Sequence, residues 1–340
     1  MNNSPFVRKA ASVQSVMLQV LLALVPGIAA YVWFFGSGIL VQILIASAAA
    51  LAGEAAMLAI RGKPRALFLT DLSAIVTAWL IALTFPPIAP WWLTALATLL
   101  AVVVVKQLYG GLGQNPFNPA MAAFCLMIVA YPALMSQWPA AGQLDSATQI
   151  KLIFGGLRDV DAITGATPLD ALRTALRTAA SPDSPFHGLR TGQLMDGPAF
   201  GLLGGPGSEW VALGYLVGGL WLIHRRIITW HIPVAFCAAL FACATLLWGM
   251  RPDAFASPLF HLASGGAMLG AFFILTDPVS GATTPRGKLL FAAGAAILTY
   301  VIRAFGAYPD GVAFATLLMN ILVPILDMKT QAPVFGHKQD

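Results

Sequence analysis

Charged residues are scarce in this chain. They account for 10% of its 340 residues, while apolar residues account for 58%; soluble domains average about 25% charged and about 45–50% apolar residues. So few charges cannot cover the outside of a soluble globule of this size, and disordered chains are much poorer in apolar residues. The composition therefore excludes a soluble enzyme and a disordered protein, and it predicts a polytopic membrane protein.

Cysteine is rare as well, with three residues in the chain: Cys125, Cys237 and Cys243. They are scattered through apolar runs and none forms a Cys-x-x-Cys pair. This excludes a disulfide framework and gives no spacing typical of a zinc or iron–sulfur site. The net charge is +5, but the basic residues form no continuous run. We therefore predict no metal site and no nucleic-acid partner.

Long apolar runs, by contrast, recur along the whole chain. Ten of them are predicted to span the lipid bilayer, at residues 16–35, 40–60, 72–85, 91–105, 120–134, 210–223, 232–248, 260–275, 289–305 and 312–325. Several are shorter than the roughly 20 residues that an upright helix needs to cross a bilayer. Short spans are typical of broken or re-entrant helices whose ends are covered by other protein.

The distribution of lysine and arginine predicts how these spans are oriented. With the N-terminus inside, twelve basic residues fall in the inner segments: Arg8, Lys9, Arg61, Lys63, Arg65, Lys106, Arg225, Arg226, Arg286, Lys288, Lys329 and Lys338. The short outer loops carry only Arg251 and Arg303, and the other five lie in the long connection between the fifth and sixth spans. The positive-inside rule then places both termini in the cytoplasm and the long connection on the outer side of the membrane.

Five spans on each side of the long connection give two halves of opposite orientation. The predicted fold is an all-α polytopic membrane protein with about ten transmembrane helices in two inverted five-helix repeats, some of them short or broken. Residues 71–87 resemble residues 261–278, since both are short apolar stretches stopped by proline. The predicted parts are a first repeat at 1–135, a periplasmic loop at 136–209, a second repeat at 210–328 and a cytoplasmic tail at 329–340.

The long connection contains a D-x-x-T-G-A-T motif at residues 161–167. Gly165 and Ala166 favour a tight, uncrowded turn, and Thr167 followed by Pro168 is typical of the N-cap and first residue of a helix. A hydroxyl at a helix start is also accessible to a modifying enzyme, and the positive end of the helix favours an attached phosphate. The residues by themselves leave both roles open.

D-x-x-[ST]-G-A-T is the flavinylation motif of bacterial redox pumps. The whole chain resembles the family of the D subunit of the Rnf ion-translocating electron-transport complex, which has the B subunit of sodium-translocating NADH:quinone reductase as a more distant relative. Three further strings carry the resemblance: GGLGQNPFNPA at 110–120, TDPVSGATTPRGK at 276–288 and YPDGVAFATLLMN at 308–320. The resemblance implies FMN bound covalently to Thr167 as a phosphoester. A flavin transferase would read the motif residues around it, namely Asp161, Thr164, Gly165 and Ala166.

A second D-x-x-[ST]-G-A-T string occupies residues 277–283, in the inner connection between the eighth and ninth spans. The transferase of this family is expected outside, so topology favours Thr167 over Thr283 as the attachment residue. The structural interpretation of the second string is a helix stop followed by a tight turn. The resemblance also implies a second, non-covalent flavin, riboflavin or FMN, near the inner face, with Ser280, Thr283 and Arg286 as candidates for holding it.

Two Asn-Pro pairs, at Asn115 and Asn118, stand in an apolar context. They indicate a broken helix whose freed backbone groups the asparagines satisfy; lining a flavin pocket or an ion route is the alternative role. Glu54 lies inside the second predicted span, where an ionisable group is costly and is a functional candidate by default. It is the candidate for an ion pathway, although its place near the inner end also suits a hydrated, interfacial role.

Three functional hypotheses follow. The first, implied by the resemblance, is a flavin-carrying subunit of a Rnf-type complex that couples electron transfer between ferredoxin and NAD to the translocation of Na⁺ or H⁺, and that is not active alone. The second is a channel or secondary transporter of the urea or ammonium type, because inverted repeats of short helices suit a solute site at the midplane. The third is a scaffold for partner subunits. The motif in the outer connection favours the first, since a simple channel has no use for it.

Overall fold

The computed structural model describes residues 12–142, 144–155, 164–179, 191–195, 197 and 199–331. Within them the regular structure is almost entirely helical. The α-helices are α1 (Val13–Phe35), α2 (Gly38–Ile60), α3 (Arg65–Leu69), α4 (Ser73–Thr84), α5 (Trp91–Leu99), α6 (Pro119–Ala130), α7 (Pro132–Met135), α8 (Ser146–Gly155), α9 (Pro168–Ala179), α10 (Thr191–Leu194), α11 (Ser208–His224), α12 (His231–Met250), α13 (Pro258–Ala263), α14 (Ala267–Leu269), α15 (Pro285–Phe305) and α16 (Val312–Thr330). Two π-helical segments, η1 (Leu100–Gln107) and η2 (Gly270–Ile274), continue α5 and α14. The described strands, β1 (Trp138–Pro139) and β2 (Thr164–Gly165), form an antiparallel pair.

Each of the ten predicted spans coincides with a helix or with consecutive helical pieces. Among the described residues, five helices are long and apolar enough to cross a membrane, namely α1, α2, α12, α15 and α16, and α4, α5 with η1, and α6 are shorter apolar helices. The eighth span is broken, because residues 264–266 separate α13 from α14. The chain is an all-α polytopic membrane protein with short and broken spans, as the sequence predicts. The limits of the four parts stay predictions.

Several helices begin at the same kind of residue pair, a polar residue followed by proline. In the described chain these pairs are Asn118-Pro119 before α6, Thr167-Pro168 before α9, Ser257-Pro258 before α13 and Thr284-Pro285 before α15. In all four, the polar side chain accepts a hydrogen bond from a backbone N–H in the first turn of the helix. Proline at the first helical position removes an N–H that has no partner within the helix. These starts are therefore determined by local sequence.

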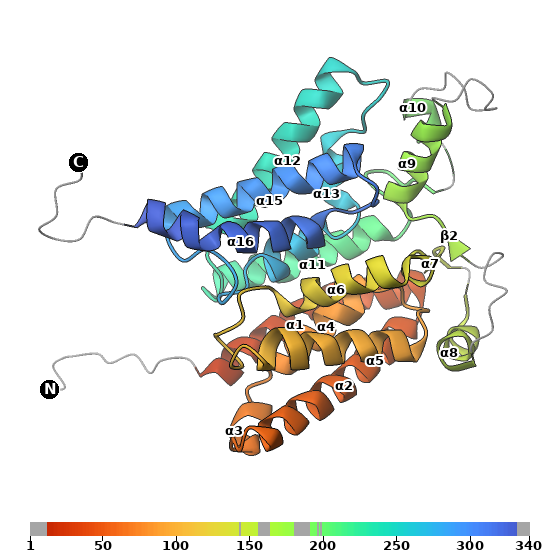
Figure 1. Cartoon of the computed structure of the whole chain (residues 1–340). Helices are drawn as coiled ribbons and strands as arrows, with labels where there is room; N and C mark the ends of the chain where they lie inside the picture. The colour runs from red at the N-terminus through yellow and green to blue at the C-terminus, as the bar shows by residue number, and fades with distance from the viewer. Residues whose placement is uncertain are drawn as a thin grey trace, which may run out of the picture.

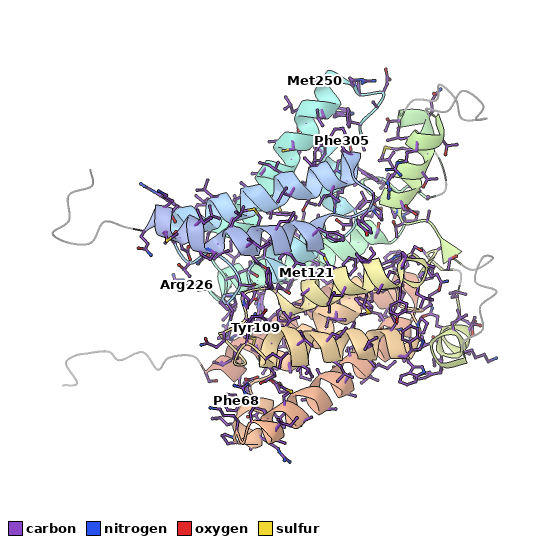
Figure 2. The ribbon with its side chains drawn as sticks, in the orientation of Figure 1. Phe68, Tyr109, Met121, Arg226, Met250 and Phe305 are labelled. Carbon is purple, nitrogen blue, oxygen red and sulfur yellow. The ribbon has the colours of Figure 1, made fainter. Side chains whose placement is uncertain are left out.

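The helices form two groups that lie side by side (Figure 1). The group from α1 to α6 meets the group from α11 to α16 where α1 packs against α11 and α6 packs against α16. The start of α1 and the end of α16 lie at one end of the bundle, while α8, β2, α9 and α10 lie at the opposite end. Figure 2 shows Phe68, Tyr109 and Arg226 at the first end and Phe305 at the second. The described parts of the long connection thus lie at the end opposite the segments that the sequence assigns to the inside.

The contact between α1 and α11 depends on glycine. Gly214 and Gly218 lie four residues apart on α11, the spacing that lets membrane helices approach closely. A Cβ atom on Gly218 would lie 1.8 Å from the carbonyl oxygen of Ala23 on α1. Because that oxygen belongs to the backbone, no change of side-chain rotamer relieves the overlap.

Gly218→Ala is therefore expected to destabilise the protein by about 1–3 kcal/mol through overpacking. Gly249→Ala on α12 is the matched control, since no described atom lies within 4 Å of the added methyl group. Alanine is favoured over glycine inside a helix by about 0.5–1 kcal/mol. Thermal unfolding of the detergent-solubilised protein, followed by tryptophan fluorescence, compares the two variants. Equal midpoints would contradict the close approach of α1 and α11.

Candidate functional site

Thr167 stands directly before α9, at the end of the bundle that carries the long connection (Figure 1). Its Oγ1 accepts a hydrogen bond from the backbone N–H of Asp170 at 3.3 Å, and its carbonyl oxygen accepts one from Ala171 at 2.7 Å. The N-cap predicted from the sequence is therefore present. Thr167 is half-buried and the preceding Ala166 is exposed, so the residue that caps the helix is partly accessible to solvent.

The middle of the motif pairs with the segment at residues 138–140. Thr164 and Gly165 form β2, in which Gly165 lies opposite Trp138 and Thr164 lies opposite Pro139. A Cβ atom on Gly165 would lie 3.1 Å from the Cβ of Ala140, so the two chain segments are in close contact. The first motif residue, Asp161, lies outside the described residues.

The break in the eighth span is stabilised by an ion pair at the same end of the bundle. Arg303 on α15 donates to the carbonyl oxygens of His261 at 2.6 Å and Ser264 at 3.2 Å. Asp310 accepts a hydrogen bond from the backbone N–H of Gly266 at 2.6 Å and pairs with Arg303 at 3.1 Å. The cation thus satisfies carbonyls at the C-terminal end of α13, and the carboxylate satisfies an N–H at the start of α14.

The start of α9 rests on this break. The Cδ1 atom of Leu169 and an Nη atom of Arg303 lie 2.6 and 3.0 Å from the place that a Cβ atom on Gly265 would occupy. Leu169 and Leu172 also form a small buried cluster with Phe260 of α13. The residue that follows Thr167 by two positions is therefore packed against the transmembrane bundle.

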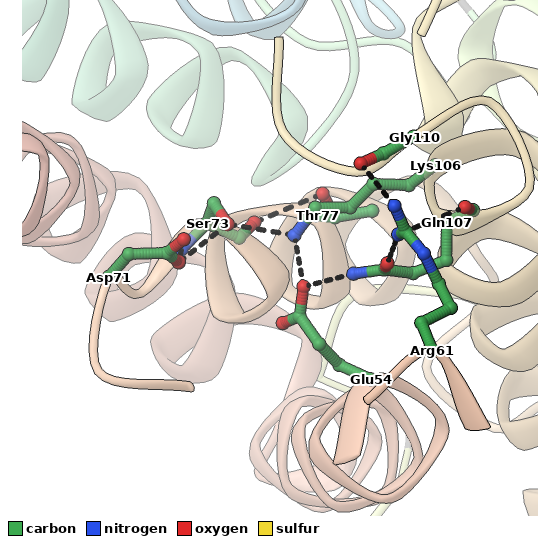
Figure 3. Close-up of polar contacts among 8 residues, drawn as sticks. All are labelled: Glu54, Arg61, Asp71, Ser73, Thr77, Lys106, Gln107 and Gly110. Atoms are coloured by element: carbon green, nitrogen blue, oxygen red, sulfur yellow. Dashed lines mark hydrogen bonds and ion pairs between the residues drawn. The ribbon is translucent and has the colours of Figure 1, made fainter. Parts of the chain in front are cut away.

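A second polar cluster lies inside the first group of helices (Figure 3). Glu54 on α2 is only 1% exposed, and its Oε1 accepts hydrogen bonds from Lys106 Nζ at 2.7 Å and Gln107 Nε2 at 2.9 Å. Lys106 also donates to Ser73 Oγ at 2.7 Å, and Ser73 donates to Asp71 at 2.6 Å. The Oε2 atom of Glu54 is buried and has no hydrogen-bond partner among the described residues. The cluster links α2, η1 and the start of α4.

The locations of Lys106 and Arg303 differ from those that the sequence predicts. The charge count assigns Lys106 to an inner segment and Arg303 to an outer loop, but both side chains are buried in helices and paired with carboxylates. Buried cations that pair with carboxylates do not indicate on which side of the membrane a segment lies. Without Lys106 and Arg303, the inner segments contain eleven basic residues and the short outer loops contain only Arg251. The sequence marks Glu54 as an acid inside an apolar run and Lys106 as a base directly after one, but it does not indicate that the two side chains pair.

A cavity of about 130 Å³ lies between the two groups of helices. It is lined mainly by apolar side chains of α1, α4, α11 and η2, and its polar lining includes Lys106, Asn115, Asn118 and Asp277. The cavity therefore brings the two predicted asparagines together with the first residue of the second motif copy. Removal from water raises the pKa of the Asp277 carboxyl above its usual range, against the effect of the hydrogen bond from Ser280.

The asparagines connect the two groups of helices. The side chain of Asn118 caps α6 and donates to the carbonyl oxygen of Ile274 at 3.2 Å. Its backbone N–H donates to Asn320 Oδ1 at 3.1 Å, and Asn320 Nδ2 donates to the carbonyl oxygen of Ser280 at 2.8 Å. Asn115 donates to the carbonyl oxygen of Phe117. These are the backbone-satisfying contacts predicted for the Asn-Pro pairs.

The other candidates for a second flavin site lie elsewhere. Thr283 is exposed, and its backbone N–H and hydroxyl donate to Asp327 on α16 at 2.9 and 2.8 Å. Arg286 is exposed in the first turn of α15. Neither side chain lines the cavity, whereas Ser280 lies beside it through its hydrogen bond to Asp277. The second motif copy thus forms a turn that is closed by a carboxylate.

Fold and site together define a polytopic helical membrane protein with a cavity between its two groups of helices and a D-x-x-T-G-A-T motif in the long connection. The chain matches the model of the NQR2, RnfD, RnfE family over residues 1–336, and it belongs to that family. The resemblance drawn from the motifs is therefore confirmed.

Close relatives share almost the whole chain. One of them, from Escherichia fergusonii, is named as the D subunit of an ion-translocating oxidoreductase complex; it is 47% identical over 354 aligned residues, with 99% of this chain and 98% of the relative covered. A protein of the same name from Ectopseudomonas mendocina is 51% identical over 344 residues, with 99% and 95% covered. Another, from Shigella dysenteriae serotype 1, is 47% identical over 354 residues, with 99% and 98% covered.

Proposed function

We propose that the chain is an electron-transfer subunit of an ion-translocating oxidoreductase complex and that it carries FMN on Thr167 through a phosphoester. The family and the names of the relatives support the first part. The second part is carried by one observation, a partly exposed threonine that ends the D-x-x-T-G-A-T motif and caps the start of α9. In this proposal partner subunits complete a complex that couples electron transfer between ferredoxin and NAD to ion movement, and a flavin transferase attaches the FMN.

The residues around Thr167 fit a phosphoester. Exposed Ala166 and the glycine before it place no bulky side chain beside the hydroxyl. The N-terminus of α9 provides a positive potential for the phosphate. A flavin attached in this way supplies one-electron transfer without leaving the protein. The packing of Leu169 against the break at residues 264–266 holds the attachment point at a constant position relative to the bundle.

The proposed orientation places the Thr167 end of the bundle in the periplasm and both termini in the cytoplasm of a bacterial inner membrane. It is supported by the excess of basic residues in the inner segments. It is also supported by the position of α8, β2, α9 and α10, which lie at the end of the bundle opposite the start of α1 and the end of α16 (Figure 1).

A second, non-covalent flavin stays a prediction. The cavity contains asparagine, lysine and carboxyl groups in an apolar lining, which suits an isoalloxazine ring in its chemistry. Its volume of about 130 Å³ is below the roughly 300–1,000 Å³ of pockets that enclose drug-sized ligands. The cavity as it stands is too small to enclose a flavin.

The channel hypothesis rests on the same two groups of helices around a cavity. The relatives are named as subunits of an oxidoreductase complex, which favours the electron carrier. Solute flux through liposomes that contain only this chain, without flavin, would favour the channel instead.

Mass spectrometry of the chain purified from membranes tests the proposal. We expect one covalent FMN on the proteolytic peptide that contains Thr167 and none on the peptide that contains Thr283. If the chain is produced together with its flavin transferase and the Thr167 peptide still has an unmodified mass, the covalent assignment is wrong.

The packing of Pro168, the residue after Thr167, against Gly205 gives a further prediction. A Cβ atom on Gly205 would lie 2.0 Å from Cγ of Pro168, and Gly205 does not adopt a positive φ. Gly205→Ala is therefore expected to displace residue 167 and lower covalent flavin several-fold without unfolding the chain. Flavin fluorescence per mole of protein on a denaturing gel measures the change. The control is Gly192→Ala in the same connection, where no described atom lies within 4 Å of the added methyl group. Equal amounts of covalent flavin in both variants would contradict the inference that the packing of Pro168 against Gly205 positions Thr167.

A further inference from the structure

The helix α8 differs in direction from the spans. Figure 1 shows α8 nearly end-on while α2 and α5 run across the page, so α8 lies across the end of the bundle. A helix that crosses the ends of transmembrane helices lies close to the plane of the membrane surface. It precedes β2 in the long connection and therefore leads into the segment with Thr167.

One face of α8 is fixed to the bundle. Gln149 is buried, and its Nε2 donates to the carbonyl oxygen of Phe35 at 2.9 Å while its Oε1 accepts from the N–H of Gly38 at 2.6 Å. Leu152, on the same face, packs in a small buried cluster with Ile88. Gln149 thus satisfies the last turn of α1 and the first turn of α2 together.

The exposed surface of α8 is divided into two strips. Successive residues are turned by about 100° around a helix, so Ala147, Ile150 and Phe154 fall on one strip and Thr148, Lys151 and Gly155 fall on the other. Ile150 and Phe154 are 44% and 56% exposed, although both are large and apolar. The helix therefore has three sides: one contacts protein, one exposes apolar side chains and one carries polar side chains.

The depth of α8 is marked by tryptophans. Trp33, in the last turns of α1, is 84% exposed, and Trp91, at the start of α5, is 48% exposed. Exposed tryptophans at the ends of spans mark the level of the lipid headgroups. Gln149 contacts Phe35, two residues beyond Trp33, and Leu152 packs near Ile88, three residues before Trp91. These contacts place α8 close to the level that the two tryptophans mark.

We propose that α8 is an interfacial helix that binds the lipid surface at this end of the bundle. Ala147, Ile150 and Phe154 enter the boundary between headgroups and acyl chains, while Lys151 faces water and the phosphates of the lipids. An amphipathic helix with basic residues on its polar side binds membranes in this way. Here the contact with lipid fixes the height of the long connection above the bilayer, and it does so whether or not Thr167 carries a flavin.

Spin labelling tests this orientation. The full-length chain, with its three native cysteines replaced by alanine, receives one nitroxide at a time through Ile150→Cys, Phe154→Cys, Thr148→Cys or Lys151→Cys. Each variant is placed in liposomes of phosphatidylethanolamine and phosphatidylglycerol, alone and with its partner subunits. Power saturation then compares collisions with oxygen, which concentrates in lipid, and with a water-soluble nickel chelate.

We expect the ratio of oxygen to nickel collisions to be several-fold higher at positions 150 and 154 than at 148 and 151. Equal ratios at the four positions, or the reverse order, would overturn the proposal. Immobilised labels at 150 and 154 that neither reagent reaches in the assembled complex would also overturn it, because a partner subunit would then cover the strip. Positions 150, 151 and 154 are exposed and position 148 is half-buried, and positions 150 and 154 are read independently of each other.

Discussion

Replacing Thr167 with asparagine is expected to abolish covalent flavin on this chain and to reduce electron transfer by the assembled complex to background. Asparagine is as good an N-cap as threonine, so α9 keeps the hydrogen bond that Oγ1 now accepts from Asp170. It offers no hydroxyl for a phosphoester. The variant therefore separates the two roles that the sequence leaves open for this residue.

Two further substitutions serve as controls for Thr167. Thr167→Ala removes the cap as well and is expected to cost about 1 kcal/mol of helix stability in addition to the flavin. Thr283→Ala, in the second copy of the motif, is expected to leave covalent flavin unchanged. The readouts are fluorescence of the chain on a denaturing gel and electron transfer by the complex. Fluorescent Thr167→Asn protein would show that the flavin is attached elsewhere.

Lys106→Met is expected to lower the free energy of unfolding by about 3–5 kcal/mol, because it leaves the Glu54 carboxylate buried and unpaired. The pair is almost completely inaccessible to solvent, at 3% and 2% exposure of the two side chains. The double variant Lys106→Met/Glu54→Gln removes both charges, and replacing a whole buried pair by uncharged groups is often neutral. We therefore expect the double variant to recover most of the lost stability. Chemical unfolding in detergent measures the cycle, and simple additivity of the two substitutions would contradict a direct charge pair.

The same double variant examines the predicted ion pathway. If Glu54 belongs to the route, the complex that contains the stable double variant transfers electrons but no longer moves ions into liposomes. If electron transfer and ion movement both persist, the Glu54–Lys106 pair serves the packing of α2 against η1 only.

Local signals made much of the fold predictable. Apolar runs located the ten spans, and the pairs of a polar residue with proline located helix starts such as those of α6 and α9, because both signals act within a few residues. The Thr167 cap was predictable for the same reason. The partners of Lys106 and Asn118 were not. They lie 52 and 202 residues away in the sequence, at Glu54 and Asn320, and no periodicity reports a contact over that separation.

The site was predictable only in part. The motif gave Thr167, and composition drew attention to Glu54 and the asparagines. Arg303 and Asp310 lie close in sequence, but their role depends on the break at residues 264–266, which becomes apparent only when α13 and α15 pack together. The orientation of α8 likewise depends on Gln149 and the two backbone groups that it binds.

The helical piece made of α14 and η2 has a consequence for how distant parts of the molecule move. It starts at the break on which Leu169 rests, and its other end reaches the cavity wall at Phe272 and Phe273. A continuous run of helical turns behaves as a short rigid rod. A displacement of this helical piece along its axis would therefore move the surface against which the first turn of α9 packs, and it would change the shape of the cavity at the same time.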